Sequence, residues 1–371
     1  MIFNNSNSLL FDRVSIDCLL SDNKFVKIYN FFIVNNYKLT ENIDITSIVI
    51  LDLCGVNSEL VDATHRKIEY YLNLGKKIIL LGCISKIFIE KYGDRLIYID
   101  SKSYTDIEKY FEFSIGISKI GEYFHNGKID ILDTDNSFKK YESELSNFDK
   151  IAFIEISDGC QLNCSYCNIK KIKGNTVSQT KENIINQIIQ EVNNKKTKIF
   201  LLSDDCGSYG SDIGTNIVEL LKDIFSINSE IKVYITNIYP SYLVKYYEDI
   251  KKFIYGGRIP YILVPVQHYS PRILKLMNRS YDVEKITEVL KDIKKNSKTE
   301  LHNHIIFNYN EETLDEFMQA LKFLNYYDKT FFFKYSDVNN IYGNNHVSYD
   351  LDKKFILLKK LQKKYNIDIS I

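Results

Sequence analysis

Residues 159–167 of the chain read Gly159-Cys160-Gln161-Leu162-Asn163-Cys164-Ser165-Tyr166-Cys167. Three thiolates on one tight loop can bind three irons of a 4Fe-4S cluster and leave the fourth iron open to another ligand. A structural zinc site and three buried thiols are the alternatives. Zinc normally takes a fourth protein ligand nearby, but the next cysteine or histidine along the chain is Cys206. The loop therefore predicts an iron-sulfur cluster with one open iron.

The loop resembles the signature of the radical SAM superfamily, and the aromatic Tyr166 before the third cysteine strengthens the resemblance. The resemblance implies that the open iron binds the amino and carboxylate groups of S-adenosylmethionine (SAM). An electron then cleaves the sulfonium to a 5′-deoxyadenosyl radical, which takes hydrogen from unactivated carbon. We expect Cys160, Cys164 and Cys167 to bind the cluster and Tyr166 to contact SAM.

A second candidate for SAM binding is the segment Ser203-Asp204-Asp205, which follows an apolar run. It stands where radical SAM enzymes carry a short Gly-Gly-Glu-like stretch that binds the methionine ammonium, so the resemblance implies that Ser203, Asp204 and Asp205 contact SAM. A solvated turn or a helix cap is the alternative. Arg279 is a candidate bidentate partner for the SAM carboxylate, and a surface arginine after a helix is the alternative there.

Residues 151–371 alternate between apolar runs and amphipathic stretches, as parallel strands joined by helices do. Strands are expected at 151–156, 198–202, 232–236, 261–264, 301–307 and 330–334. Helices are expected at 181–193, 216–225, 271–277, 283–295 and 314–327, with a lysine-rich helix at 351–365. Six strands joined in this way predict a partial (β/α)6 barrel, whose chemistry lies at the carboxyl ends of the strands.

Residues 1–125 show a similar alternation, with helices expected at 21–35 and 61–74, and predict a separate Rossmann-like domain with a parallel sheet. The polar stretch 126–150 predicts a linker. Cys54 and Cys83 each end an apolar run, and Cys18 follows a weaker strand. The carboxyl ends of parallel strands share one edge, so we expect these three cysteines to lie near one another. Their spacing leaves a second cluster and ordinary buried thiols both open.

Almost the whole chain resembles the radical SAM methylthiotransferases, and it is most similar to the branch that methylthiolates threonylcarbamoyladenosine in tRNA. The matching motifs are Leu53-Cys54-Gly55-Val56, Leu81-Gly82-Cys83, 158–167, Lys173-Gly174-Asn175, 202–216, Val264-Pro265-Val266-Gln267 and 276–281. The resemblance implies that Cys18, Cys54 and Cys83 bind an auxiliary cluster, which makes two 4Fe-4S clusters in all. It also implies that one SAM methylates a sulfur of the auxiliary cluster and that a second SAM starts the radical reaction.

The chain departs from this family in four places. Relatives usually continue into a small RNA-binding β-barrel, whereas this sequence ends at Ile371. The turn that is Gly-Phe-Pro-Gly-Glu-like in relatives reads 307–312 here and has no glycine or proline. An Arg-x-Gly-Thr-like element is replaced by 335–340, and a Gln-Ser pair by Gln267-His268. These differences leave both clusters in place and argue against a polynucleotide substrate.

Composition gives weaker constraints. The chain has 371 residues, 45% of them hydrophobic and 26% charged, as in an ordinary globular protein. Its 48 Lys and Arg balance 48 Asp and Glu, which argues weakly against RNA because phosphate neutralisation supplies much of RNA affinity. No apolar run has the length of a membrane span, and the N-terminus lacks the features of a signal peptide. We expect a cytoplasmic protein with no membrane contact and no structural disulfide.

Among the histidines, His268 follows a predicted strand end and His304 stands where relatives carry an acid. Both are candidate substrate contacts, with a satisfied core histidine as the alternative. Cys206 is expected to fill the core.

The resemblance implies a methylthiotransferase that converts C–H to C–SCH3 with two molecules of SAM. We expect a peptide or protein residue as the acceptor, with the modified adenosine of tRNA as the alternative acceptor. A non-catalytic iron-sulfur redox protein is the alternative of a different class. No catalytic residue is assigned beyond the cluster ligands, and we expect a monomer that receives electrons from flavodoxin or ferredoxin.

Overall fold

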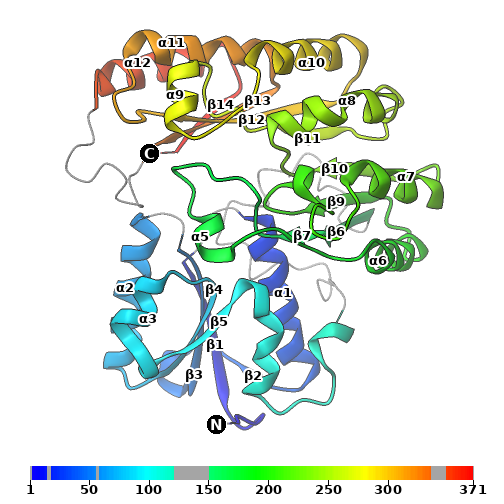
Figure 1. Cartoon of the computed structure of the whole chain (residues 1–371). Coiled ribbons are helices and arrows are strands. Elements are labelled where there is room, and N and C mark those ends of the chain that lie inside the picture. The colour runs from blue at the N-terminus through cyan, green and yellow to red at the C-terminus, as the bar shows by residue number, and fades with distance from the viewer. Residues whose placement is uncertain (1, 15–17, 56–57, 121–149, 336–347, 371) are drawn as a thin grey trace. The chain divides into compact units, whose positions relative to one another are not determined.

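The computed structural model describes residues 2–14, 18–55, 58–120, 150–335 and 348–370. The chain forms two compact units, one comprising Met1–Asp149 with Lys171–Lys173 and the other Lys150–Lys170 with Gly174–Ile371 (Figure 1). Apart from Lys150, the linker expected at 126–150 lies outside the described residues. Among the helices that are described, none has the length and apolarity that a bilayer span requires.

The first unit is built on a parallel sheet of five strands in the order β2-β1-β3-β4-β5. These strands are β1 (Ser8–Val14), β2 (Lys38–Leu39), β3 (Ile48–Cys54), β4 (Lys77–Cys83) and β5 (Ile97–Asp100). Every residue of β3 is buried. A strand covered on both faces needs apolar side chains on both, which explains the uninterrupted apolar run.

Helices cover both faces of this sheet. Helix α1 (Leu19–Val34) and the 3-10 segment η3 (Ser101–Lys109) pack on one face, against residues such as Ile48 and Ile50. Helices α2 (Ser58–Asn73) and α3 (Lys86–Tyr92) pack on the other, against Val49 and Leu51. Successive residues of β3 therefore pack into two hydrophobic cores, one on each face of the sheet. This arrangement confirms the predicted Rossmann-like domain.

The second unit contains a parallel sheet in the order β14-β13-β12-β11-β10-β9-β6. Its strands are β6 (Ile151–Glu155), β9 (Lys198–Leu202), β10 (Lys232–Ile235), β11 (Tyr261–Leu263), β12 (Glu300–Phe307), β13 (Lys329–Lys334) and β14 (Ile367–Ser370). The first six are the predicted strands. In the described part of the chain β6 and β14 are the two edges of the sheet, so the barrel is open, as expected.

Most connections of the second unit are the predicted helices: α6 (Lys181–Asn193), α7 (Ile217–Ile227), α9 (Pro271–Leu276), α10 (Val283–Asn296), α11 (Leu314–Ala320) and α12 (Leu351–Leu361). Helix α8 (Pro240–Tyr255) and strand β14 are among the elements that were not predicted. Helix α8 begins with proline at its first turn, a signal that the expected pattern did not include. Strand β14 has only four residues, too few for a clear alternation. The expected helix at 314–327 ends early and continues as the 3-10 segment η9 (Leu321–Tyr326).

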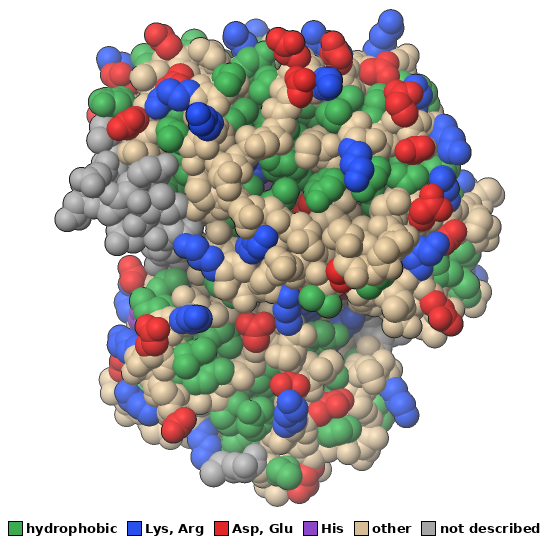
Figure 2. All heavy atoms as spheres, in the orientation of Figure 1, with side chains coloured by type: hydrophobic (Ala, Val, Ile, Leu, Met, Phe, Trp, Pro, Cys, Tyr) green, Lys and Arg blue, Asp and Glu red, His purple; other side chains and the backbone are tan. Residues whose placement is uncertain are grey.

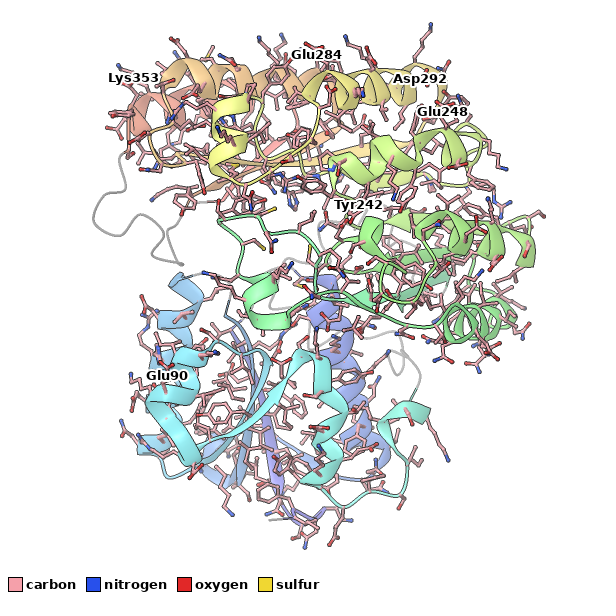
Figure 3. The ribbon with its side chains drawn as sticks, in the orientation of Figure 1. Glu90, Tyr242, Glu248, Glu284, Asp292 and Lys353 are labelled. Carbon is pink, nitrogen blue, oxygen red and sulfur yellow. The ribbon has the colours of Figure 1, made fainter. Side chains whose placement is uncertain are left out.

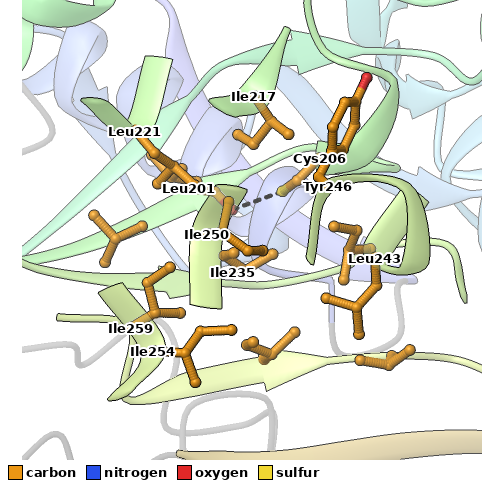
Figure 4. Close-up of a cluster of buried hydrophobic side chains, with 14 of the residues drawn as sticks. Leu201, Cys206, Ile217, Leu221, Ile235, Leu243, Tyr246, Ile250, Ile254 and Ile259 are labelled. Atoms are coloured by element: carbon orange, nitrogen blue, oxygen red, sulfur yellow. Dashed lines mark hydrogen bonds between the residues drawn. The ribbon is translucent and has the colours of Figure 1, made fainter. Parts of the chain in front are cut away.

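The two faces of this second sheet carry different side chains. Leu201 and Ile235 point into an aliphatic core formed with α7 and α8 (Figure 4). Cys206 is fully buried in the same core, where its thiol lies 3.6 Å from the Leu201 carbonyl oxygen, so its predicted filling role is confirmed. The opposite face bears an aromatic row, with ring centroids of Phe200 and Tyr234 4.2 Å apart on neighbouring strands.

Candidate active site

The predicted cluster loop follows β7 (Ser157–Asp158), which pairs with β8 (Val177–Ser178). Gly159 opens the loop with a φ of +83°, and a Cβ there would lie 2.5 Å from the Asn175 carbonyl oxygen. Its N–H donates to Asp204 Oδ2 at 2.8 Å, and the Cys160 N–H donates to the Gly174 carbonyl at 3.2 Å. A glycine is therefore required where the loop crosses a neighbouring backbone.

The other end of the loop rests on the end of α9. The Ser165 N–H donates to the Met277 carbonyl at 3.0 Å, and its hydroxyl donates to the Leu276 carbonyl at 2.7 Å. The Asn278 amide donates to the Asn163 carbonyl at 2.7 Å. The Leu276–Tyr281 motif thus helps to hold the cysteine loop. The two segments are far apart in the sequence, since Asn278 and Asn163 are separated by 115 positions.

The three cysteines of the loop are free thiols of intermediate exposure. Burial raises the pKa of Cys160 to about 12 and that of Cys167 to about 11. Among the described residues, no three His, Cys, Asp or Glu side chains converge on a point where one metal ion would sit. A 4Fe-4S cluster does not need such convergence, because each thiolate binds a different iron. Three thiols on one loop therefore suit such a cluster.

The acidic segment lies beside the loop. Asp205 is 2% exposed, and its Oδ1 accepts the N–H groups of Gly207 at 3.1 Å and Tyr239 at 3.0 Å. Burial raises the pKa of Asp205 to about 6. The Ser203 hydroxyl accepts the Asp205 N–H at 3.1 Å and lies 2.7 Å from the Ser157 hydroxyl. The segment is therefore a buried turn in which Asp205 caps the short 3-10 helix η8 (Cys206–Ser208), so the helix-cap alternative is confirmed for Asp205 and the solvated alternative is wrong.

Arg279 is also buried, at 6% exposure, so it is not the surface arginine of the alternative prediction. Its Nη1 donates to the Tyr166 hydroxyl at 2.9 Å and approaches Cys164 Sγ at 3.5 Å, and its Nη2 donates to the Pro265 carbonyl at 2.6 Å. The guanidinium carbon lies 4.4 Å from the centre of the Tyr239 ring. The structure thus brings Arg279, Tyr166 and a predicted cluster ligand together.

Several buried polar atoms around this point have no hydrogen-bond partner among the described residues. They are Asp205 Oδ2, Asn237 Oδ1, Gln267 Oε1 and Arg279 Nε. They belong to the segments that follow β9, β10, β11 and α9. Buried polar atoms are normally satisfied, so such a set indicates a polar ligand. Acceptors together with a guanidinium N–H suit the ammonium and carboxylate of SAM, so these residues fit that cofactor.

Asn237 and Gln267 were not among the predicted site residues. Asn237 lies about two residues after the end of β10 and Gln267 about four residues after the end of β11, on the side of the sheet where the chemistry was expected. Gln267 also has a φ of +66°, which is unusual for a residue other than glycine. Position after a strand was the signal that could have identified both.

His268 does not lie where a substrate can reach it. Its side chain is fully buried, Nδ1 accepts the Ser270 N–H at 2.9 Å, and Nε2 lies 2.8 Å from Glu312 Oε1. Both ring nitrogens are therefore used inside the protein, which argues for the core role and against the predicted substrate contact. The candidate failed because the partner, Glu312, is 44 positions away and carries no local signal.

His304 remains a candidate substrate contact. It is partly exposed, and its ring meets Phe331 and Phe333 edge-on, at centroid distances of 5.5 and 5.0 Å. His302, two residues earlier, is 3% exposed, and its Nδ1 lies 3.2 Å from the Tyr261 hydroxyl. The two histidines differ in access, with His304 nearer to solvent.

In the first unit, the three other cysteines follow neighbouring strands. Cys54 and Cys83 are register partners at the ends of β3 and β4, so their predicted proximity is confirmed. Cys18 immediately precedes α1, after β1, the other neighbour of β3. Gly55 lies against this edge, and a Cβ there would lie 2.5 Å from the Cys83 carbonyl oxygen. Cys54 and Cys83 thus lie together at this edge, and Cys18 lies at the start of the helix that follows the neighbouring strand.

A buried ion network lies close to these cysteines. Arg13 bridges Asp22 of α1 at 2.6 Å and Asp52 of β3 at 3.0 Å. Burial raises the pKa of Asp52 to about 7, against the lowering effect of Arg13. The network joins the first turn of α1 to the carboxyl end of β3.

Comparison with known proteins agrees with this geometry. The Radical SAM superfamily matches residues 154–324. The ribosomal protein uS12 methylthiotransferase RimO of Clostridium botulinum (strain Eklund 17B / Type B) is 28% identical over 321 residues, covering 81% of this chain and 69% of the relative. A probable threonylcarbamoyladenosine tRNA methylthiotransferase of Pyrococcus horikoshii is 24% identical over 299 residues, covering 78% and 68%.

Among solved structures, the radical SAM methyltransferase TsrM from Kitasatospora setae superposes with a TM-score of 0.57, covering 88% of this chain and 74% of that one. At 10% identity this likeness concerns the fold alone. Residues 154–324 are thus similar to the Radical SAM superfamily, and most of the chain is similar to methylthiotransferases that act on a ribosomal protein or on tRNA.

Proposed function

We propose that this enzyme converts a C–H bond of a peptide or protein residue to C–SCH3, using two molecules of SAM. The observation that carries the proposal is the presence of two separate sets of three cysteines, one on each unit. In the overall reaction the substrate loses a hydrogen atom to the 5′-deoxyadenosyl group of one SAM. It gains a methylthio group whose methyl comes from the other SAM.

The radical site would be held by Cys160, Cys164 and Cys167. When bound, a 4Fe-4S cluster there supplies the electron that cleaves SAM. Asp205 offers an unpaired buried carboxylate oxygen to the SAM ammonium. Ser203 holds the backbone of that turn, and Asp204 ties it to Gly159. Arg279 offers its Nε–H to the SAM carboxylate, and Tyr166 completes this wall of the site.

The second cluster would be held by Cys18, Cys54 and Cys83, and we propose it as the source of the inserted sulfur. The two sites would have different roles: the first generates the radical on the substrate carbon, and the second carries the methylthio group to be added. An enzyme that binds both reactants lowers the entropic cost of bringing them together. Electrons would come from flavodoxin or ferredoxin, and the enzyme would act as a monomer.

A protein acceptor is favoured by charge and by the relatives. RimO is named for its action on ribosomal protein uS12. Lys and Arg balance Asp and Glu in this chain, and both signs are interspersed on the face shown in Figure 2. His304, partly exposed between two phenylalanines, is the proposed acceptor contact. The tRNA relatives keep the modified adenosine as the second candidate acceptor.

Iron counting tests the two-site assignment. Anaerobically reconstituted enzyme should carry about eight irons per chain, four for each set of three thiolates. Replacing Cys160, Cys164 and Cys167 by alanine should remove about half, and so should replacing Cys18, Cys54 and Cys83. Cys206→Ala is the matched control and should keep all the iron, because that thiol is in the aliphatic core. Full iron in either triple variant contradicts the assignment.

Product analysis tests the division of work. The Cys18, Cys54 and Cys83 triple variant should still cleave SAM to 5′-deoxyadenosine in the presence of reductant but should form no methylthio product. Methylthiolated product from this variant would show that the sulfur comes from elsewhere. If the wild-type enzyme forms no 5′-deoxyadenosine, the proposed radical reaction is wrong.

Salt dependence of binding distinguishes the acceptors. Binding to unmodified tRNA should be weak and should change little between about 50 and 200 mM salt, because few counterions would be released. A fall of about a hundredfold or more over this range would imply several phosphate contacts and would favour the tRNA acceptor.

A further inference from the structure

The sulfur of Cys164 has a charged neighbour. Arg279 Nη1 lies 3.5 Å from Cys164 Sγ and 2.9 Å from the Tyr166 hydroxyl, which itself lies against the same sulfur. One guanidinium group and one phenol therefore converge on a single predicted cluster ligand.

Arg279 is held firmly in this position. Its Nη2 donates to the Pro265 carbonyl at 2.6 Å, and its backbone N–H donates to the Leu274 carbonyl at 2.8 Å. Its guanidinium carbon also lies 4.4 Å from the Tyr239 ring centre and 5.7 Å from that of Tyr281. At 6% exposure, the cation cannot turn away into solvent without breaking these contacts.

The other two sulfurs of the loop have neutral backbone donors. The Ile169 N–H points at Cys167 Sγ with a nitrogen-sulfur distance of 3.4 Å, and the Leu162 N–H interacts with Cys160. These donors come from the loop and the start of α5 (Ile169–Lys173). The arginine reaches Cys164 from a distant part of the chain, 115 positions away.

A cation and hydrogen bonds next to a thiolate ligand stabilise the more negative, reduced state of an iron-sulfur cluster. Hydrogen bonds to the sulfurs, net charge and solvent exposure are the main protein features that set its potential. The effect is larger where water is excluded, since buried charges are screened less.

We propose that Arg279, together with Tyr166, sets the reduction potential of the cluster bound by Cys160, Cys164 and Cys167. Arg279 acts through Cys164 and is a positioning residue in this role, in addition to any contact with SAM. Removing it makes the cluster harder to reduce. The inference rests on the proposed function only in requiring a 4Fe-4S cluster on this loop.

The test is an EPR-monitored redox titration of the full-length reconstituted enzyme. The relevant signal is the one that changes when SAM is added, which separates the open-iron cluster from the second one. Arg279→Met should shift its midpoint to more negative potential. Tyr166→Phe should shift it in the same direction by less, and Arg279→Lys should fall between wild type and Arg279→Met. Arg272→Met is the control, since it removes an equally large cation from α9, one that pairs with Glu316, and should leave the midpoint unchanged.

The outcomes separate the two proposals. Absence of any SAM-responsive cluster signal in wild type overturns the proposed function itself. A SAM-responsive wild type with an unchanged midpoint in Arg279→Met overturns the potential-setting role. If Arg279→Met binds no cluster, Tyr166→Phe and Arg279→Lys decide, and wild-type midpoints in both overturn the role.

Discussion

Lys354 Nζ lies 2.8 Å from Glu312 Oε2, and both side chains are fully buried. The same ammonium donates to the Glu312 carbonyl at 2.8 Å, and the carboxylate also accepts the Asn308 N–H at 2.6 Å. His268 engages its other oxygen. One carboxylate thus joins α12 to the turn after β12 and to the segment after β11.

Breaking this pair should destabilise the second unit strongly. Lys354→Met removes the cation and leaves a buried carboxylate, for which a loss of about 3–5 kcal/mol in the free energy of unfolding is typical. Denaturation in urea, followed by circular dichroism, measures it. Lys353→Met is the matched control from the preceding position of α12 (Figure 3). Lys353 is 66% exposed, so its replacement should cost less than about 1 kcal/mol. Equal midpoints for the two variants would contradict the buried ion pair.

Glu316 should titrate at unusually low pH. Its hydrogen bonds with Arg272 are the main reason that its pKa falls from 4.5 to about 2. A folded-state pKa below the unfolded value means that this group stabilises the fold above pH 4.5. That contribution is lost as pH falls towards 2. Carbon-detected NMR of the Glu316 carboxyl measures the value directly. Arg272→Met should move the pKa up towards 4.5, and no movement would show that the arginine is not the cause.

Gly159→Ala should cost the loop its cluster. The added Cβ would lie 2.5 Å from the Asn175 carbonyl oxygen at a φ of +83°, so the loop must shift. We expect the iron content to fall by about half. Gly214→Ala is the control that distinguishes a steric clash from an unfavourable backbone conformation. Gly214 also has a positive φ, +74°, but nothing lies within 4 Å of the added Cβ. This substitution should cost about 1–2 kcal/mol of stability and retain the iron. Full iron in Gly159→Ala would contradict the close crossing.

Asp205→Asn should weaken SAM binding without loss of iron. A charge-assisted hydrogen bond to the SAM ammonium contributes about 1.5–3 kcal/mol, which corresponds to roughly a 10- to 100-fold increase in Kd. Equilibrium dialysis of SAM against the reconstituted enzyme measures it. Asp223→Asn, on a side chain 45% exposed in α7, should bind SAM as wild type does. Unchanged affinity in Asp205→Asn would exclude this carboxylate from the SAM site.

The turn after β12 adopts positive φ angles without the glycine that relatives have there. The sequence lacks the glycine and proline expected there, yet Asn308 and Glu311 adopt φ values of +59° and +58°. Asparagine tolerates the left-handed region better than most residues, and glutamate does not. The turn is held there by the Glu312 carboxylate, which accepts the Asn308 N–H. A missing glycine therefore did not mean a missing turn.

Local sequence patterns predicted six strands of the second sheet and the parallel, Rossmann-like sheet of the first unit. They also predicted that the three cysteines of residues 160–167 lie on one loop. Apolar periodicity and thiolate spacing are properties of neighbouring residues, so they can be read from the sequence. The tertiary structure alone showed that Arg279 reaches Cys164, that Asn237 and Gln267 point unpaired polar atoms into the protein, and that His268 serves Glu312. These pairings join segments 44 to 115 positions apart. Only the packing of the folded chain brings such groups together, because no short-range signal records which distant partner a buried polar group will meet.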